Sequence, residues 1–196
     1  MARGAAGRVK SPGVFVAIVG PSGAGKDSLI RGLGERLTGR DGVVIARRVV
    51  TRPSDDHEDH DTMDEAAFEE AEGAGRFALS WSAHGLSYGV PVEIDAAIEE
   101  GKIVVCNISR SAVAGVRQRY VRSRVVLVTA RPEILAARLA ARGREGTEAR
   151  RDRLERAGAS AAALEPDVVL DNNGLLNQTV TRLCQYVLSC RASISA

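Results

Sequence analysis

The sequence predicts an α/β fold of three layers with a parallel core sheet. Apolar, β-branched stretches alternate with helical patterns along the 196 residues, as in proteins whose helices cover both faces of a parallel sheet. Two stretches, 103–106 and 125–128, are apolar throughout, as expected of strands buried on both faces. Strands are expected at 14–19, 43–50, 76–81, 103–108, 124–129 and 167–170, and helices at 26–38, 63–72, 91–100, 110–120, 132–142, 147–163 and 174–191.

The composition indicates one globular domain. Hydrophobic residues make up 44% of the chain and charged residues 27%, which are ordinary proportions for soluble proteins. We expect a disordered tail over residues 1–12 and a single domain over 13–196. The three cysteines and three histidines lack the spacing of a zinc site.

The net charge and the hydrophobic pattern limit the classes of partner that the protein is expected to bind. A net charge of +2 is too small to indicate nucleic-acid binding. No apolar stretch approaches the length of a membrane span, and the first twelve residues lack the hydrophobic region of a signal peptide. We therefore expect a cytoplasmic protein with a small-molecule substrate, without nucleic-acid or membrane partners. Whether it forms a homodimer stays open.

A glycine-rich loop directly follows the first predicted strand and precedes a helical stretch. In this arrangement backbone N–H groups converge on phosphate oxygens, and the following helix adds the positive end of its dipole. The lysine that ends the loop reaches the outer phosphates as a mobile charge. The loop predicts a nucleoside triphosphate site formed by Gly20, Pro21, Ser22, Gly23, Ala24, Gly25 and Lys26.

The residue after Lys26 departs from the usual phosphate-loop pattern. That pattern has a Ser or Thr whose hydroxyl ligates Mg²⁺, whereas this chain has Asp27 followed by Ser28. In one interpretation Asp27 is a carboxylate favoured by the helix dipole, and Ser28 supplies the hydroxyl. In the other, Asp27 lies in the metal shell, directly or through water. Both residues are candidate Mg²⁺ ligands.

Two regions interrupt the alternation of strands and helices. Residues 51–100 hold a polar loop, a short helix and a β-like stretch, enough for a small inserted lobe. Residues 138–157 are dense in arginine, and guanidinium groups neutralise the oxygens of a transferring phosphoryl group. A phosphate loop, an inserted lobe and an arginine-rich lid are the plan of small kinases that bind two phosphorylated molecules. The candidate catalytic residues are Lys26, Arg138, Arg142 and Arg153.

These features resemble the guanylate kinase branch of the nucleoside monophosphate kinases over most of residues 14–190. The matching segments are Gly20–Lys26, Val50-Thr-Arg-Pro53, Gly85-Leu-Ser-Tyr-Gly89, Arg138–Gly143 and Val168–Asn173. The resemblance implies that Arg52 and Tyr88 hold the phosphate of the acceptor. It also implies that the arginine segment closes over the donor, and that the last segment, with Asn172, lines the adenine pocket.

The groups that bind guanine in that family are missing. Its Phe-Leu-Glu segment, whose glutamate contacts the base, matches Ala78-Leu-Ser80 here, so that Ser80 replaces the carboxylate. Its Asp-x-Asp stretch at the end of the central strand matches Asn107-Ile-Ser109. A site that loses the hydrogen-bond partners of a base loses discrimination for it. We therefore expect an acceptor that is phosphorylated but is not a guanine nucleotide.

Several unusual segments resemble a narrower family, the ribose 1,5-bisphosphate phosphokinases. They are Lys26-Asp-Ser-Leu29, Leu79-Ser-Trp81, His84-Gly85, Tyr88-Gly-Val90, Val92-Glu-Ile-Asp95, Asn107-Ile-Ser-Arg110 and Arg142-Gly-Arg-Glu145. The resemblance implies ATP- and Mg²⁺-dependent phosphorylation of ribose 1,5-bisphosphate to 5-phosphoribosyl 1-diphosphate, for phosphonate breakdown or nucleotide precursor supply. The residues alone indicate a kinase for a small phosphorylated acceptor.

Further substrate-binding candidates come from their positions along the chain. Asn107, Ser109 and Arg110 end a buried strand, at the edge where open α/β sheets bind ligands. Asp95 lies in the first turn of a predicted helix, where a sugar contact and stabilisation by the dipole are equally supported. The run 55–61 is either a solvated loop or binds ribose hydroxyls through Glu58 or His60.

Three other functions stay open at this level. One is a guanylate kinase with a relaxed base pocket, and another is a kinase for a different sugar phosphate. The third is a binding module that has lost catalysis, against which Lys26 and the arginine-rich segment argue. In the favoured mechanism an acceptor phosphate oxygen attacks in line without a general base, and lid closure excludes water.

Overall fold

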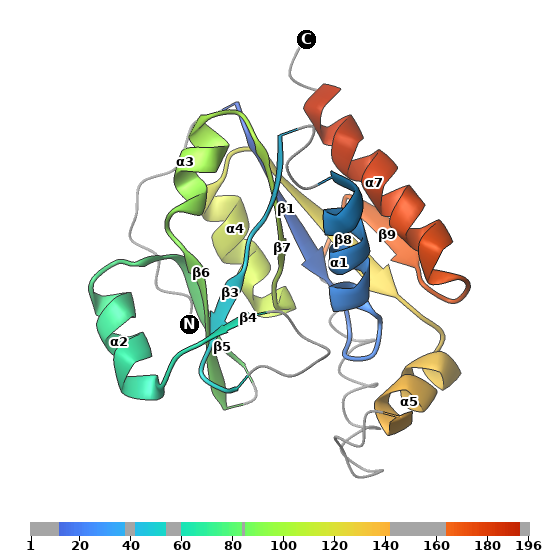
Figure 1. Ribbon diagram of the computed structural model, residues 1–196, viewed down its shortest axis with the longest axis horizontal. Coiled ribbons are helices and arrows are strands. Elements are labelled where there is room, and N and C mark those ends of the chain that lie inside the picture. The colour runs from blue at the N-terminus through green and yellow to red at the C-terminus, as the bar shows by residue number, and fades with distance from the viewer. Residues whose placement is uncertain (1–11, 38–41, 54–59, 84, 142–163, 193–196) are drawn as a thin grey trace.

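The core is a five-stranded sheet in the order β2-β7-β1-β8-β9, and all its neighbouring strands are parallel. The computed structural model describes residues 12–37, 42–53, 60–83, 85–141 and 164–192 (Figure 1). The strands are β1 Val14–Val19, β2 Val43–Ile45, β7 Ile103–Asn107, β8 Ser123–Thr129 and β9 Val168–Asp171. The parallel sheet expected from the apolar stretches is confirmed.

Helices cover both faces of this sheet (Figure 1). On one face, Val14, Val16 and Ile18 of β1 belong to a hydrophobic cluster with residues of α1 Lys26–Leu37, α5 Pro132–Ala141 and α7 Leu176–Ala192. On the other face, the alternate residues of β1 pack with α3 Ile94–Glu99, the 3-10 turn η1 Arg110–Ala112 and α4 Val113–Arg119. The three layers follow from this alternation.

The inserted lobe is a second sheet, in the order β4-β3-β6-β5. Its elements are β3 Arg48–Val50, β4 His60–Thr62, β5 Phe77–Ala83, β6 Leu86–Pro91 and the helix α2 Glu65–Gly73. Asp64 caps α2 by accepting a hydrogen bond from the Ala67 N–H at 2.8 Å. The helix packs on one face of the lobe, where Phe68 stacks on Phe77 with 4.6 Å between ring centroids.

The structure divides one expected strand and adds two more. The expected strand 43–50 breaks between Ile45 and Arg48, and its halves join different sheets. Strands β4 and β6 were not predicted, because β4 follows a charged run and β6 contains a glycine. The helix expected over 110–120 begins as a 3-10 turn, and the one expected over 147–163 lies outside the described residues.

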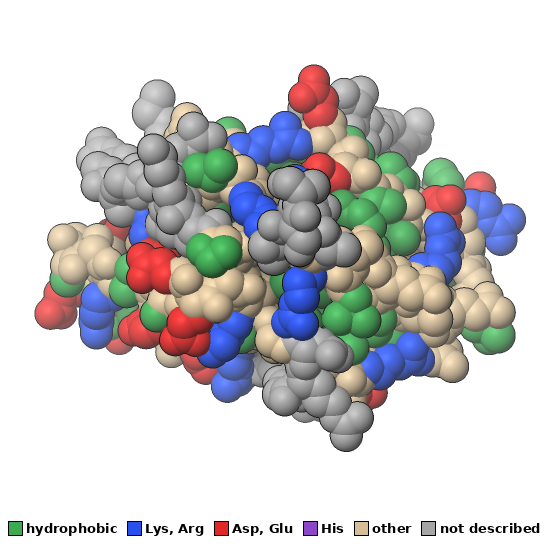
Figure 2. Space-filling model, turned by 90° about the horizontal axis from the view of Figure 1, so that it is seen from above, with side chains coloured by type: hydrophobic (Ala, Val, Ile, Leu, Met, Phe, Trp, Pro, Cys, Tyr) green, Lys and Arg blue, Asp and Glu red, His purple; other side chains and the backbone are tan. Residues whose placement is uncertain are grey.

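The surface carries charges of both signs. On the face shown in Figure 2, the described Lys and Arg side chains form separate groups among acidic and apolar ones and do not merge into one basic surface. In the described part of the chain, no helix is both long and apolar enough to cross a membrane.

Candidate active site

The glycine-rich loop connects the end of β1 to α1 and lies tightly against two other segments. Gly20 has a φ of 151°, and a Cβ there would lie 2.2 Å from the carbonyl oxygen of Val128 in β8. Gly25 has a φ of 88°, and a Cβ there would lie 2.5 Å from Nδ2 of Asn172. A side chain at either position would displace the loop, which explains these two glycines.

Lys26 folds back over this loop. Its Nζ donates hydrogen bonds to the carbonyl oxygens of Gly20 at 2.9 Å and Pro21 at 3.0 Å. The first N–H groups of a helix have no partners within the helix, and α1 begins at this lysine. An ammonium group and a helix N-terminus at one loop form a site for an anion such as a polyphosphate. Ser22 in the loop is exposed, and Ser28 in the first turn of α1 is half-buried.

Two distant side chains support the outside of the loop. Asn172 donates from Nδ2 to the carbonyl oxygen of Ala24 at 2.8 Å. Arg138 of α5 donates from Nη2 to the carbonyl oxygen of Asn172 at 2.9 Å and from Nη1 to that of Gly23 at 3.4 Å. The structure therefore brings Arg138 and Asn172 to the loop. The two remaining lid candidates, Arg142 and Arg153, lie outside the described residues.

Asp27, at the start of α1, joins the core to the lobe. Asn107, the last residue of β7, donates from Nδ2 to Oδ1 of Asp27 at 2.7 Å. Nη2 of Arg48 in β3 lies 3.7 Å from the same oxygen. Both contacts use Oδ1 of Asp27 and neither uses Oδ2. No group of three or more Asp, Glu, His or Cys gathers as a metal site among the described residues.

One face of the lobe sheet carries the aromatic and cationic groups. Tyr88 of β6 stacks on Trp81 of β5 with ring centroids 5.4 Å apart, and the guanidinium carbon of Arg48 lies 5.9 Å from the Tyr88 ring centroid. Val50 of β3 pairs with Tyr88, which places Arg52, two residues further on, near the same end of the lobe. The carbonyl oxygen of Arg52 accepts from the Thr62 hydroxyl at 3.1 Å. The strand pairing thus brings the backbone of Arg52 near Tyr88, and their joint contact with the acceptor phosphate stays a prediction.

The residues after β7 have distinct roles. Ser109 caps η1, accepting from the backbone N–H of Ser111 at 3.1 Å, so its hydroxyl caps a turn in this structure. Arg110 is half-buried at the carboxyl edge of the sheet, and burial lowers the pKa of its guanidinium.

Ser80 does not lie on the face of Tyr88. Within β5 it pairs with Gly89, whereas Trp81 pairs with Tyr88, so Ser80 points to the opposite side of the sheet. There its hydroxyl donates to Oε1 of Glu72 in α2 at 2.6 Å. The expectation that Ser80 contacts the acceptor is therefore corrected.

Asp95 also lies away from the loop. Its carboxylate forms an ion pair with Arg119 and accepts a hydrogen bond from the Tyr120 hydroxyl at 2.7 Å. Tyr120 stacks on Phe15, near the start of β1, with centroids 4.9 Å apart, whereas the glycine loop follows the other end of that strand. The sheet separates Asp95 from the loop, so its expected substrate contact is corrected to a structural role.

His60 is the described member of the charged run that the structure buries. It is 2% exposed and pairs with Arg48 in the parallel β3–β4 ladder. Its Nδ1 lies 3.2 Å from the carbonyl oxygen of Asp61, and its Nε2 has no hydrogen-bond partner in the chain that the structure describes. The solvated-loop alternative does not hold for His60. Glu58 lies outside the described residues.

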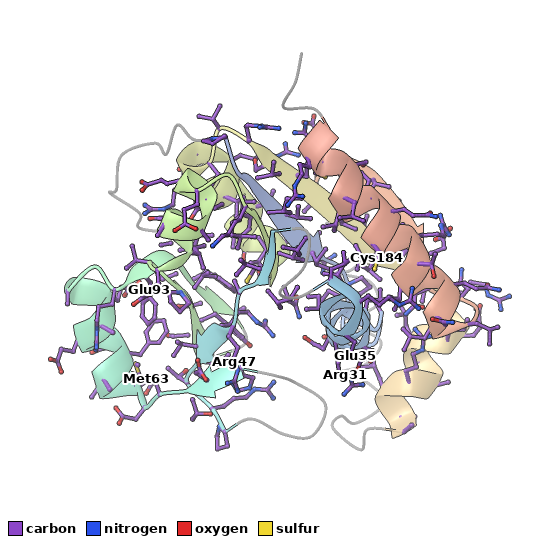
Figure 3. The ribbon with its side chains drawn as sticks, turned by 45° about the horizontal axis from the view of Figure 1, so that its top comes forward. Arg31, Glu35, Arg47, Met63, Glu93 and Cys184 are labelled. Carbon is purple, nitrogen blue, oxygen red and sulfur yellow. The ribbon has the colours of Figure 1, made fainter. Side chains whose placement is uncertain are left out.

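A cavity of about 270 Å³ opens between α1 and the chain that passes from β2 to β3. Asp27 and Arg31 line it from α1, and Arg47 and Arg48 line it from the opposite side. Figure 3 shows Arg31 and Arg47 on these two elements, facing the space between them. Sequence reasoning missed Arg48; the available signal was the Arg47-Arg48 pair between two β-branched runs, the second of which leads to Arg52.

Comparison with known proteins gives matches over nearly the whole chain. A model of the guanylate kinase family matches residues 13–189. The curated ribose 1,5-bisphosphate phosphokinase of Methylobacterium radiotolerans is 47% identical over 179 residues, which cover 91% of this chain and 99% of that protein. The protein of the same name from Acidiphilium cryptum is 45% identical over 179 residues, covering 91% and 94%.

Solved structures give the same fold. The crystal structure of guanylate kinase from Anaplasma phagocytophilum matches with a TM-score of 0.70 and 19% identity, covering 95% of this chain and 89% of that one. At this identity the likeness shows the arrangement of core sheet, helices and lobe, and nothing finer.

Proposed function

The chain belongs to the guanylate kinase family, and we propose that it transfers a phosphoryl group from ATP to ribose 1,5-bisphosphate, forming 5-phosphoribosyl 1-diphosphate. The relatives named above carry that activity in their names. The cavity beside the phosphate loop is the observation in the structure that carries the proposal. Arg31, Arg47 and Arg48 line it, and guanidinium groups suit phosphate oxygens rather than a neutral base.

The donor half of the proposed mechanism uses the loop. Backbone N–H groups of residues 20–26 and the ammonium group of Lys26 hold the phosphates of ATP. Oδ2 of Asp27 and the hydroxyl of Ser28 are the oxygens proposed to hold Mg²⁺, which supplies neutralisation of phosphate charge. Arg138, which donates to the loop carbonyls of Gly23 and Ala24, keeps the loop in shape and stands close to the transferring group.

The acceptor half uses the lobe. We propose that Arg52 and Tyr88 hold the 1-phosphate of the acceptor, with Asn107 and Arg110 at the carboxyl edge of the sheet lining the path between donor and acceptor. A phosphate dianion is already nucleophilic, so no general base is needed and catalysis rests on positioning and charge neutralisation. Arg142 and Arg153 remain proposed lid residues.

The test is ³¹P NMR of the purified protein with Mg–ATP and ribose 1,5-bisphosphate, with GMP as a parallel acceptor. A diphosphate signal with the ribose compound alone supports the proposal. Turnover of GMP alone would assign the protein to guanylate kinase activity. Binding of ATP without turnover of either acceptor would favour another sugar phosphate, and absence of ATP binding would favour a binding module.

A further inference from the structure

We propose that Arg48 binds the phosphate of the acceptor that does not react, and so makes the site specific for a sugar with two phosphates. The inference rests on the proposed function, because ribose 1,5-bisphosphate carries its second phosphate on C5. It concerns a residue outside the set that the sequence indicated.

The first support is the incomplete bonding, among the described residues, of a cation whose side chain is largely but not fully buried. The side chain of Arg48 is 11% exposed, and its guanidinium has five N–H donors. Its interactions with described residues are the ion pair with Asp27 at 3.7 Å and the contact with the ring of Tyr88 at 5.9 Å. Neither is a hydrogen bond, and a buried charge is costly unless it is both paired and hydrogen-bonded.

The second support is that Asp27 is only a partial partner. Its Oδ1 already accepts a hydrogen bond from Asn107 at 2.7 Å, and this fixes the carboxylate at a distance from Arg48. Asp27 therefore holds the guanidinium in place without saturating it. A phosphate group, with three oxygens that match the fork of an arginine, would complete its bonding.

The third support is the place and charge of the cavity. It begins at Asp27, directly after the loop lysine, and extends along α1 past Arg31 to Gly34, away from the donor loop. Arg31 lines it from α1, and Arg47, which pairs with Asp61 at 3.2 Å, lines it from the opposite side (Figure 3). Three guanidinium groups line the cavity, and Asp27 lies 3.7 Å from that of Arg48. An acceptor whose reacting phosphate lies near Lys26 and Tyr88 would extend its other end into this cavity.

The competing interpretation is that Arg48 is structural and only supports Asp27 and Tyr88. Comparing ribose 1,5-bisphosphate with ribose 1-phosphate, which lacks the second phosphate, distinguishes these two interpretations. If Arg48 contacts that phosphate, its replacement weakens ribose 1,5-bisphosphate and leaves ribose 1-phosphate unaffected. If Arg48 only positions its neighbours, its replacement weakens both ligands equally.

The experiment is isothermal titration of both ligands, without nucleotide, into the wild type, Arg48→Met, Arg48→Lys and the control Arg76→Met. Arg76 is an exposed arginine of the same lobe. We expect Arg48→Met to weaken ribose 1,5-bisphosphate by about 10- to 100-fold, the effect of a lost charge-assisted hydrogen bond. Ribose 1-phosphate should change by less than about twofold. Arg48→Lys should lie between, because it keeps the charge and loses the fork.

Equal losses for both ligands, or no loss for either, would overturn the inference. So would a wild type that binds the two ligands equally well. Thermal melting of each variant identifies one that fails to fold, and Arg48→Lys then carries the test. Transfer to ribose 1,5-bisphosphate is followed by ³¹P NMR on the same preparations. An Arg48-dependent preference for the bisphosphate without transfer would reject the proposed function and retain the binding assignment.

Discussion

Two clusters built from the same three residue types lie at opposite ends of the core sheet. They consist of Asp27, Arg48 and Tyr88 at the carboxyl end of β1 and Asp95, Arg119 and Tyr120 toward its amino end. In both, an arginine pairs with an aspartate and lies over a tyrosine ring, at 5.9 Å in the first and 5.8 Å in the second.

The two clusters differ in how fully their polar groups are bonded. Asp95 accepts hydrogen bonds from both Arg119 and Tyr120. Burial first, and then the hydrogen bond and charge of Asp95, raise the pKa of Tyr120. In the other cluster, Arg48 has an aspartate at 3.7 Å and no side-chain hydrogen bond to any residue that the structure describes. A saturated cluster stabilises a fold, whereas an unsaturated one beside a cavity is suited to a ligand.

The difference between the clusters predicts that substitutions at the loop end change activity and that substitutions at the other end change stability.

The largest effect is expected for Lys26→Ala, which removes the ammonium group that the loop carbonyls of Gly20 and Pro21 now hold. Turnover should fall by at least about 10³-fold because charge neutralisation at the phosphates is lost. Steady-state kinetics and urea denaturation test this, with Lys102→Ala as control. Full activity in Lys26→Ala would reject the site.

Substitutions in the cluster of Asp95, Arg119 and Tyr120 should lower stability and leave activity nearly unchanged. Asp95→Asn leaves Arg119, which is 8% exposed, without its counter-charge, and the free energy of unfolding should fall by about 3 kcal/mol. The kcat/KM should stay within about twofold of the wild type. Urea denaturation and kinetics measure both, with the exposed Glu99→Gln on the same helix as control. A loss of kcat/KM at unchanged stability would restore the substrate contact expected from the sequence.

A smaller effect is expected at Asp27. Asp27→Asn keeps an oxygen for Asn107 and removes the charge near Oδ2, so turnover should fall by about 10- to 100-fold and the Mg²⁺ concentration for half-maximal activity should rise. Stability should fall by less than the roughly 3 kcal/mol expected for Asp95→Asn, because Asp27 lies 3.7 Å from Arg48 and no hydrogen bond joins the two side chains. Ser28→Ala is the matched variant. A changed Mg²⁺ requirement in Ser28→Ala alone would assign the metal to the hydroxyl.

Features that depend on contiguous residues could be predicted from the sequence, and features that depend on distant contacts could not. The phosphate loop is a local signal, because its glycines, its lysine and the flanking strand and helix are contiguous, and the structure has them as expected. The core strands were predictable for the same reason. Apolar runs buried on both faces depend little on which strand lies beside them.

The errors arise where long-range pairing decides a side chain's direction. The β5–β6 ladder shifts register between Phe77 and Leu79, and such a shift reverses the face of every following residue. Ser80 consequently points to α2. Asp95 finds its partners 24 and 25 residues away, and Arg48 gains its position because the chain leaves the core sheet after Ile45.

The smallest expected effect is a loss of stability at alkaline pH. Cys106, near the Asp27 cluster, should cause it below pH 10, and Tyr120, in the Asp95 cluster, above pH 10. Burial raises the pKa of the Cys106 thiol from 9.0 to about 12, and the charge of Arg48 opposes this shift. The neutral thiol is favoured in the fold, so its contribution is fully present below pH 9 and is lost as the pH rises toward 12. Unfolding free energy should fall by about 1 kcal/mol between pH 8 and 10.

Cys106→Ala measures this contribution, in a background with Cys184 and Cys190 also replaced by alanine, since burial raises their pKa values too. Urea denaturation at several pH values should show the loss below pH 10 only when Cys106 is present. Above pH 10 the ordinary pKa of tyrosine is passed, and Tyr120 of the saturated cluster should add its own loss in both proteins. The Cys106 thiol is next in the chain to Asn107, which holds Asp27. If the free energy of unfolding declines equally below pH 10 without Cys106, a different group causes the decline.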